Sequence, residues 1–265
     1  MKRLISLLLV LTVAGGAARA QKFALPEGGY EGTNVLRVLL VGNSFTYFHD
    51  CDSMLLQISR SQGLDIRLGE YLKGGQTFGQ HLNLPRTSEA IAAGSYHFAF
   101  IQDYSNNPAL YARDKRKDIL ENTRELKRRI LQASPTCQVI LERTWSYEGA
   151  EAGGFGTGAN LDFFLGKGAA EIARKADVWL SPIGIGFNTV RAERPDIDLF
   201  EPDAKHQSAA GSYLKCCINY LVLTGKPFSG TVATCGVEPE TAAYLRQVAE
   251  RTVLGHEKEY RIQSR

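Results

Sequence analysis

Short apolar runs alternate along the chain with longer segments whose apolar positions recur at helical spacing. Val35–Val41 is almost wholly apolar and rich in β-branched residues, which is typical of a strand covered on both faces. In the following segment, Phe45–Arg60, the residues Met54, Leu55 and Ile58 recur at helical spacing. The same alternation predicts further strands at Asp65–Leu72, Tyr96–Ile101, Gln138–Leu141 and Val178–Leu180, and further helices at Leu82–Ala93, Lys115–Ala133, Asp162–Lys175, Ser208–Leu223 and Pro239–Val253.

This alternation indicates a single α/β domain over residues 21–265. Strands separated by helices of this length predict a parallel sheet with helices on both faces and right-handed crossovers. The glycine-rich stretch Glu148–Ala159 lies inside the alternation, so we expect a mobile loop there and not a boundary between domains. In open sheets of this kind, ligands bind beyond the carboxyl ends of the strands. Functional residues should therefore directly follow strands.

The first twenty residues have the pattern of a secretory signal peptide. Lys2 and Arg3 precede the apolar run Leu4–Ala14, which is too short to span a bilayer comfortably. Ala18 and Ala20 place small residues at the two positions that a signal peptidase reads. We therefore expect cleavage after residue 20 and a periplasmic or secreted protein, with an uncleaved anchor as the alternative. No later stretch is long and apolar enough to predict membrane insertion.

Charge and cysteine content narrow the classes of partner and cofactor. The 31 basic and 28 acidic residues give a net charge of +3, and the absence of a basic run with interleaved aromatics argues against a nucleic-acid partner. Export permits disulfides, and Cys235 with Cys216 or Cys217 is the expected pairing, with buried unpaired thiols as an equal alternative. No spacing among the cysteines and histidines suits a metal, so neither a metal nor another cofactor is predicted. The oligomeric state is left open.

Two separated segments carry residues suited to nucleophilic catalysis. Ser44 follows the first buried strand and precedes a helix, so its hydroxyl is expected at the edge of the sheet, although a helix N-cap is an alternative role. Asp203 precedes His206 by three residues in a loop before a helix. At that spacing the carboxylate can accept the imidazole Nδ1–H, which leaves Nε2 free as a base. A metal site is the alternative, but no third ligand is evident nearby.

Taken together, the sequence G-N-S-F at Ser44 and the D-x-x-H that ends at His206 resemble the first and last blocks of the SGNH (GDSL-like) hydrolase superfamily. The resemblance extends from about Val35 to Gly225. It implies a triad of Ser44, His206 and Asp203 in a serine esterase that needs no cofactor. It also implies a flavodoxin-like three-layer α/β/α sandwich with five parallel strands, which agrees with the strand count above.

The resemblance also suggests an oxyanion hole. The family's second block supplies a backbone N–H from a glycine, which Gly75 matches, and the N–H of Ser44 is the other backbone donor; a plain strand-to-helix turn is the alternative role for Gly75. The third block commonly reads G-x-N-D, whereas this chain has Q-D-Y-S-N from position 102. That form is similar to a variant in carbohydrate-acetylesterase branches. It implies the Gln102 amide as a further donor, with Asn106 as the fallback.

The same resemblance favours an ester of a carbohydrate, or of a small molecule, as the substrate, with an O-acetyl group as the acyl group removed. Trp145 follows the fourth strand and is a candidate for stacking on a sugar ring, with core packing as the alternative. Asn106 and Asn188 are the other candidate substrate contacts. His49 is expected to be a partly buried helix histidine or to line the site, and His81 to be structural. The alternative functions are a lipase or thioesterase of the same superfamily and a non-catalytic glycan-binding protein.

Overall fold

A six-stranded sheet forms the centre of the molecule. The computed structural model describes residues 21–25, 35–147 and 150–263, so the predicted signal peptide lies outside the described residues. The strand order is β1-β3-β2-β4-β5-β6, in which β1 is antiparallel to β3 and the other pairs are parallel. The strands are β1 (Gln21–Ala24), β2 (Val35–Gly42), β3 (Asp65–Lys73), β4 (Phe98–Ile101), β5 (Gln138–Glu142) and β6 (Trp179–Ser181).

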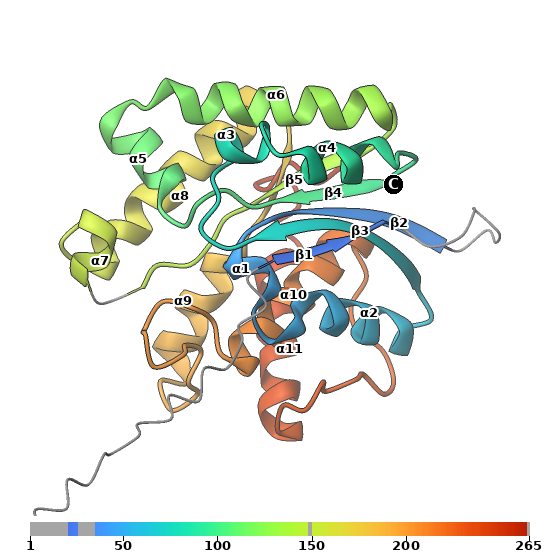
Figure 1. Cartoon of the computed structure of the whole chain (residues 1–265). Helices are drawn as coiled ribbons and strands as arrows, with labels where there is room; N and C mark the ends of the chain where they lie inside the picture. The colour runs from blue at the N-terminus through green and yellow to red at the C-terminus, as the bar shows by residue number, and fades with distance from the viewer. Residues whose placement is uncertain (1–20, 26–34, 148–149, 264–265) are drawn as a thin grey trace, which may run out of the picture.

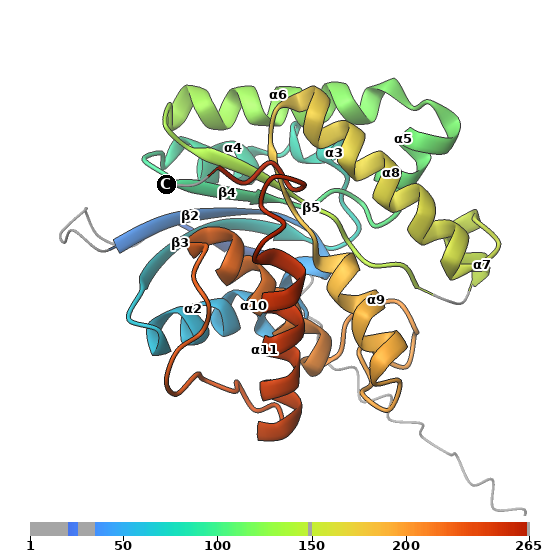
Figure 2. The ribbon, with the colours of Figure 1, turned by 180° about the vertical axis from the view of Figure 1, so that it is seen from behind.

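Helices cover both faces of this sheet and give three layers. Figures 1 and 2 show α3 to α6 and α8 on one face, and α2 with α9 to α11 on the other. The elements are α1 (Ser44–Tyr47), η1 (Phe48–Asp50), α2 (Cys51–Ser61), α3 (Phe78–His81), α4 (Pro85–Ala92), α5 (Asn107–Asp114), α6 (Lys117–Ala133), α7 (Ala150–Gly154), α8 (Gly158–Ala176), α9 (Ile183–Glu193), α10 (Ala209–Thr224) and α11 (Pro239–Val253). Helix α10 is buried over most of its length, because α2, α9 and α11 all pack against it.

The five predicted parallel strands are confirmed, with ends shifted by two residues or fewer. The sixth strand, β1, was missed because four residues at a sheet edge carry almost no periodic signal. Tertiary contacts hold this strand in place. Lys22 is buried and its ammonium pairs with Asp50, at 3.0 Å, and with Asp52. The edge strand is thereby tied to the start of the crossover from β2 to β3.

The helix predictions were wrong in three places. The expected helix Phe45–Arg60 is broken into α1, η1 and α2, because His49 and Asp50 adopt left-handed backbone angles with φ of 53° and 51°. Helices α3, α5 and α9 were not predicted. The glycine-rich stretch predicted as a loop instead contains α7 and the start of α8, while residues 148–149 lie outside the described part of the chain.

The five cysteines are unpaired, so the predicted disulfide with Cys235 is wrong. Four of them are buried. Cys216 donates to the backbone carbonyl of Cys51 at 3.2 Å, and Cys235 donates to the carbonyl of Met54 at 3.8 Å. These thiols pack as small apolar side chains, which is the alternative that the sequence left open.

The parallel register brings the carboxyl ends of four strands to one edge of the sheet. Gly42 at the end of β2 is paired with Leu72 in β3, and Ile101 at the end of β4 is paired with Leu141 in β5. The loops that follow these strands therefore emerge side by side, as expected for the ligand-binding edge of an open α/β sheet. None of the helices among the described residues is both long and apolar enough to cross a membrane.

Candidate active site

Ser44 opens helix α1 directly above the end of strand β2. The residue before it, Asn43, is the N-cap, because its side-chain oxygen accepts the N–H of Phe45 at 3.2 Å. The alternative that Ser44 itself caps the helix is therefore wrong. The hydroxyl of Ser44 is free of capping and is directed toward a residue 162 positions later in the chain.

That residue is His206, and the three predicted triad residues form one hydrogen-bonded relay. His206 Nε2 lies 2.8 Å from Ser44 Oγ, and His206 Nδ1 lies 2.5 Å from Asp203 Oδ2. The other carboxylate oxygen, Asp203 Oδ1, accepts the backbone N–H groups of Lys205 at 3.0 Å and His206 at 2.9 Å. One carboxylate thus orients the imidazole and also fixes the loop that carries it.

Asp203 remains ionised under the conditions in which a histidine base works. Burial raises the pKa of its carboxyl, but the hydrogen bonds from the His206 side chain and from two backbone N–H groups outweigh burial, so the pKa lies below its ordinary value. Its side chain is 48% exposed, so water also solvates the charge. An ionised carboxylate on Nδ1 favours the tautomer with Nε2 unprotonated.

Two phenylalanines from the nucleophile's own segment hold the imidazole ring. Phe48 stacks on His206 with ring centroids 4.2 Å apart and an interplanar angle of 9°. Phe45 meets the same ring edge-on at 5.5 Å. Ser212 in α10 donates its hydroxyl to the carbonyl of Phe48 at 3.2 Å, which fixes the turn that carries this phenylalanine. The ring is therefore restrained on a face and along an edge as well as at both nitrogens.

Asn43 connects three loops around Ser44. Its side-chain amide donates to the carbonyl of Gln76, at 3.1 Å, and to the carbonyl of Asp103, at 3.3 Å. The turn that contains Gly75, which has φ of 72°, is thus held against the nucleophile's loop. Among the described residues, neither the N–H of Ser44 nor that of Gly75 has an acceptor. Both are therefore available to a developing oxyanion.

The hydrogen bonds of Gln102 hold the loop that carries Ser44. The side chain is buried, its oxygen accepts the N–H of Asn43 and the hydroxyl of Thr46, and its NH₂ donates to the carbonyl of Asp103. A Cβ at Gly42 would lie 2.7 Å from Thr46 Oγ1 and 3.1 Å from Gln102 Oε1, so only glycine admits this network. One of the two N–H groups of the Gln102 amide is used in this network, so its donation to an oxyanion stays a prediction.

The predicted substrate contacts Trp145 and Asn106 differ in how far they are buried. Trp145 is fully buried, with Phe45 stacked on one face at 4.5 Å and Phe187 on the other at 4.5 Å. Both faces of its indole are covered, so stacking on a sugar is wrong and the packing alternative holds. Asn106, the predicted fallback oxyanion donor, is half-buried and donates to the carbonyl of Gly153 at 3.1 Å.

Asn188 lies half-buried in α9, and among the described residues no hydrogen bond joins it to the triad. Its role as a substrate contact stays a prediction.

His49 forms a second link between the two catalytic segments that sequence reasoning missed. It lies in η1, and its Nε2 is 2.6 Å from Glu201 Oε1, five residues before His206. Glu201 also donates its N–H to the carbonyl of His206 at 2.8 Å. Since the partners are 152 positions apart, no local pattern predicts their contact. The one local feature that marks His49 is its left-handed backbone, which interrupts the helix predicted across it.

His81 supports the end of strand β2, as its predicted structural role requires. It is fully buried, with Nε2 3.0 Å from the carbonyl of Gly42 and Nδ1 3.0 Å from the hydroxyl of Thr87. Burial lowers its pKa to about 4, although the hydrogen bond to Gly42 opposes that change. The folded protein thus keeps this ring neutral where an unfolded chain protonates it.

We expect His81 to weaken the fold in acid. As the pH falls below about 6.5 the unfolded state takes up a proton that the folded state refuses, which costs about 2 kcal/mol of unfolding free energy between pH 7 and pH 5. His81→Gln keeps a donor for Gly42 but does not titrate, so it should lose about 2 kcal/mol less than wild type over this range. Urea unfolding at both pH values measures the difference. His256→Gln, at an exposed histidine, is the control, and equal losses in wild type and His81→Gln would contradict the assignment.

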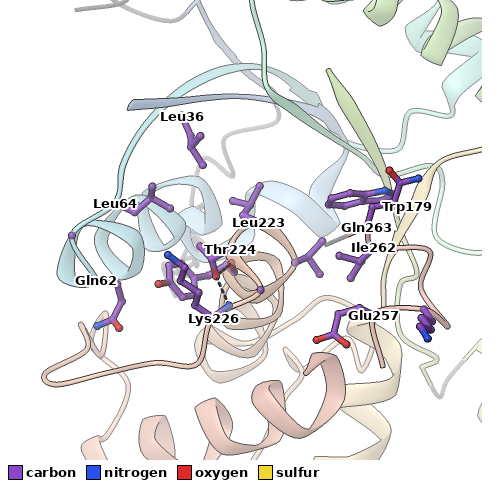
Figure 3. Close-up of a pocket in the computed structure, with 15 residues that line it drawn as sticks. Leu36, Gln62, Leu64, Trp179, Leu223, Thr224, Lys226, Glu257, Ile262 and Gln263 are labelled. Atoms are coloured by element: carbon purple, nitrogen blue, oxygen red, sulfur yellow. Dashed lines mark hydrogen bonds between the residues drawn. The ribbon is translucent and has the colours of Figure 1, made fainter. Parts of the chain in front are cut away.

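A cavity of about 820 Å³ lies at the opposite edge of the sheet. Figure 3 shows side chains from the start of β2 (Leu36), the start of β6 (Trp179), the end of α10 (Leu223) and the C-terminal segment (Ile262) around it. It contains no triad residue. The candidate active site is therefore the group of Ser44, His206 and Asp203 at the carboxyl edge of the sheet. Over the described part of the chain, no group of three or more histidine, cysteine, aspartate or glutamate residues could hold a metal ion.

Solved structures share this architecture at low sequence identity. A DUF4886 family protein from Bacteroides uniformis superposes with a TM-score of 0.70 and 16% identity, covering 88% of this chain and 98% of that one. A putative SGNH hydrolase from Slackia heliotrinireducens gives 0.58 and 23% over 71% of this chain and 98% of its own. An acetylxylan esterase from Geobacillus stearothermophilus gives 0.53 and 16% over 71% and 93%.

Comparison by sequence gives no match to any family model or to any curated protein. The likeness therefore lies in the arrangement of strands and helices. Six strands, five of them parallel, lie between two helical layers, and the edge strand β1 is the one addition to the five-stranded sheet expected from the sequence. The chain has the fold of the SGNH hydrolases.

Proposed function

We propose that this protein is an exported serine esterase that removes an O-acetyl group from a carbohydrate through an acyl-enzyme. The observation that carries the proposal is the relay from Ser44 Oγ through His206 to Asp203, with contacts of 2.8 Å and 2.5 Å. These three groups come from two loops at the ligand-binding edge of the sheet. Their order of contact is that of a nucleophile, a base and an orienting carboxylate.

The geometry supports a two-step mechanism. His206 Nε2 takes the proton of Ser44 as its Oγ attacks the ester carbonyl carbon, and Asp203 stabilises the imidazolium that forms. The negative charge on the carbonyl oxygen is met by the N–H groups of Ser44 and Gly75. The imidazolium then protonates the leaving alcohol. Water, deprotonated by His206, attacks the acyl-enzyme and releases the carboxylic acid and the free Ser44 hydroxyl.

The substrate class is supported by chemistry and by likeness. One structural neighbour, seen in several variants, is named as an acetylxylan esterase or acetyl-xylooligosaccharide esterase. For this chain, the acetyl group and the carbohydrate carrier belong to the proposal. Export is supported by the signal-like pattern of residues 1–20 in the sequence.

Release of acetate from acetylated xylo-oligosaccharides and from 4-nitrophenyl acetate tests the proposal. We expect turnover of both, with 4-nitrophenyl acetate preferred over the octanoate ester by about tenfold or more in kcat/KM. A preference for the octanoate would favour a lipase or thioesterase. Binding of the oligosaccharides without acetate release would favour a glycan-binding protein, and that result would overturn the esterase proposal.

A further inference from the structure

Lys205 places an ammonium group at the rim of the candidate active site. Its backbone is fixed on both sides: its N–H donates to Asp203 Oδ1 at 3.0 Å, and its carbonyl accepts the indole N–H of Trp145 at 3.0 Å. The next residue in the chain is the base, His206. Since the main chain here cannot shift without disturbing the triad, the lysine side chain starts from a defined position.

The ammonium lies against two tyrosine rings and not against a carboxylate. Lys205 Nζ is 5.4 Å from the ring centroid of Tyr104 and 5.2 Å from that of Tyr147. Tyr104 belongs to the loop after β4, and Tyr147 to the segment after β5, where its ring meets Phe45 edge-on at 6.5 Å. Three loops of the ligand-binding edge thus converge on this cation.

No protein group neutralises that charge in the part of the chain that the structure describes. None of the three N–H donors of the Lys205 ammonium has an acceptor there, and no carboxylate lies within 4 Å of it. By contrast, Lys175 lies 5.8 Å from the ring of Tyr111 but also bonds to Glu171 at 2.7 Å. A half-buried ammonium over aromatic rings, with its donors unused, is suited to an anionic ligand.

We propose that Lys205 selects esters whose alcohol carrier bears a negative charge, such as an acetylated uronic acid or an acetylated sugar phosphate. This inference rests on the proposed function. An acetyl group carries no charge of its own, so the anion that meets the ammonium belongs to the carrier. The neutral rings of Tyr104 and Tyr147 carry no charge to oppose that attraction, and no carboxylate among the described residues pairs with the ammonium. The carrier would then be held beside His206, where its oxygen must be protonated.

Three matched probes test this proposal: an acetylated methyl glucuronide, the corresponding acetylated methyl glucoside, and the acetylated methyl glucoside 6-phosphate. We expect kcat/KM for at least one anionic ester to exceed that of the neutral ester by about tenfold or more, and the two anionic arms tell carboxylate from phosphate. Lys205→Met should remove this ratio by lowering kcat/KM for the anionic esters far more than for the neutral ester, while Lys205→Arg should keep it. Salt at 0.5 M should reduce the ratio.

The variant Lys175→Met is the control. Lys175 in α8 also lies over a tyrosine ring, but its ammonium is paired with a carboxylate. This variant should leave all three rates unchanged. Turnover without any preference for the anionic esters would overturn the role of Lys205, as would an equal loss on all three esters in Lys205→Met. Absence of all turnover would instead refute the esterase. In that case calorimetric binding of methyl glucuronide and methyl glucoside 6-phosphate, compared between wild type and Lys205→Met, still decides the inference.

Discussion

Replacing Ser44 by alanine should reduce ester hydrolysis to the level of the uncatalysed reaction plus a small residual. The hydroxyl that lies 2.8 Å from His206 Nε2 is the only group placed to form the acyl-enzyme in this relay, so kcat should fall on the order of 10⁴-fold to 10⁶-fold. The residual comes from the N–H groups of Ser44 and Gly75, which the substitution leaves in place. Initial rates with 4-nitrophenyl acetate measure the loss.

Ser53→Ala is the matched control for this change. Ser53 lies exposed on α2, where its hydroxyl accepts only from Gln57, so its rates and its unfolding midpoint should equal those of wild type. The fold of Ser44→Ala should also be unchanged, because Asn43 and not Ser44 caps helix α1. Equal rates in wild type and Ser44→Ala would show that hydrolysis takes place elsewhere and would end the esterase proposal.

The sequence predicts the relay well because its parts are coded locally. Asp203 and His206 are three residues apart, so a single loop can set their contact, and Ser44 comes just after a mainly apolar strand. Their convergence follows from the parallel order of the sheet, which the alternation of strands and helices already implies. The joining of two segments 162 residues apart is thus a consequence of topology.

By contrast, the local sequence does not predict which way a side chain points in the loop after a strand. Trp145 and Gln102 both follow strands; position suggested ligand contact for Trp145, and the resemblance of the third block suggested it for Gln102. The structure turns Trp145 into the core between two phenylalanines and uses Gln102 to brace Asn43. Which of two successive side chains faces inward depends on packing between layers, and this packing leaves no periodic trace in a loop.

Contacts that support the triad are likewise invisible in a single sequence. Phe48 covers His206 only because the chain turns at His49 with a left-handed backbone, and the bond of His49 to Glu201 closes that turn onto the second loop. A histidine and an aspartate carry no sequence signal for such a turn beyond the tolerance of short polar residues for positive φ. The helix predicted across this point was wrong for the same reason.

Asp203→Asn should cost about 10⁴-fold in kcat although it changes the shape of the site very little. The asparagine oxygen can still accept the N–H groups of Lys205 and His206, so the loop keeps its form. Its NH₂, however, then faces His206 Nδ1, which must accept instead of donate. The ring proton moves to Nε2, and a protonated Nε2 cannot take the proton of Ser44. Asp198→Asn is the control, because Asp198 caps the N–H of Phe200 in the same loop without touching the imidazole.

Asp203→Ala separates the two roles that one carboxylate performs here. Because Asp203 is 48% exposed, water can accept the Nδ1–H of His206 after truncation, which restores the useful tautomer. If tautomer control dominates, Asp203→Ala should therefore retain more activity than Asp203→Asn, measured as kcat with 4-nitrophenyl acetate. If Asp203→Ala is instead the weaker enzyme, the two backbone hydrogen bonds to Asp203 Oδ1 matter more than the tautomer of the ring, and the side chain acts chiefly by holding His206 over Ser44. A loss below tenfold in both variants would remove Asp203 from the relay.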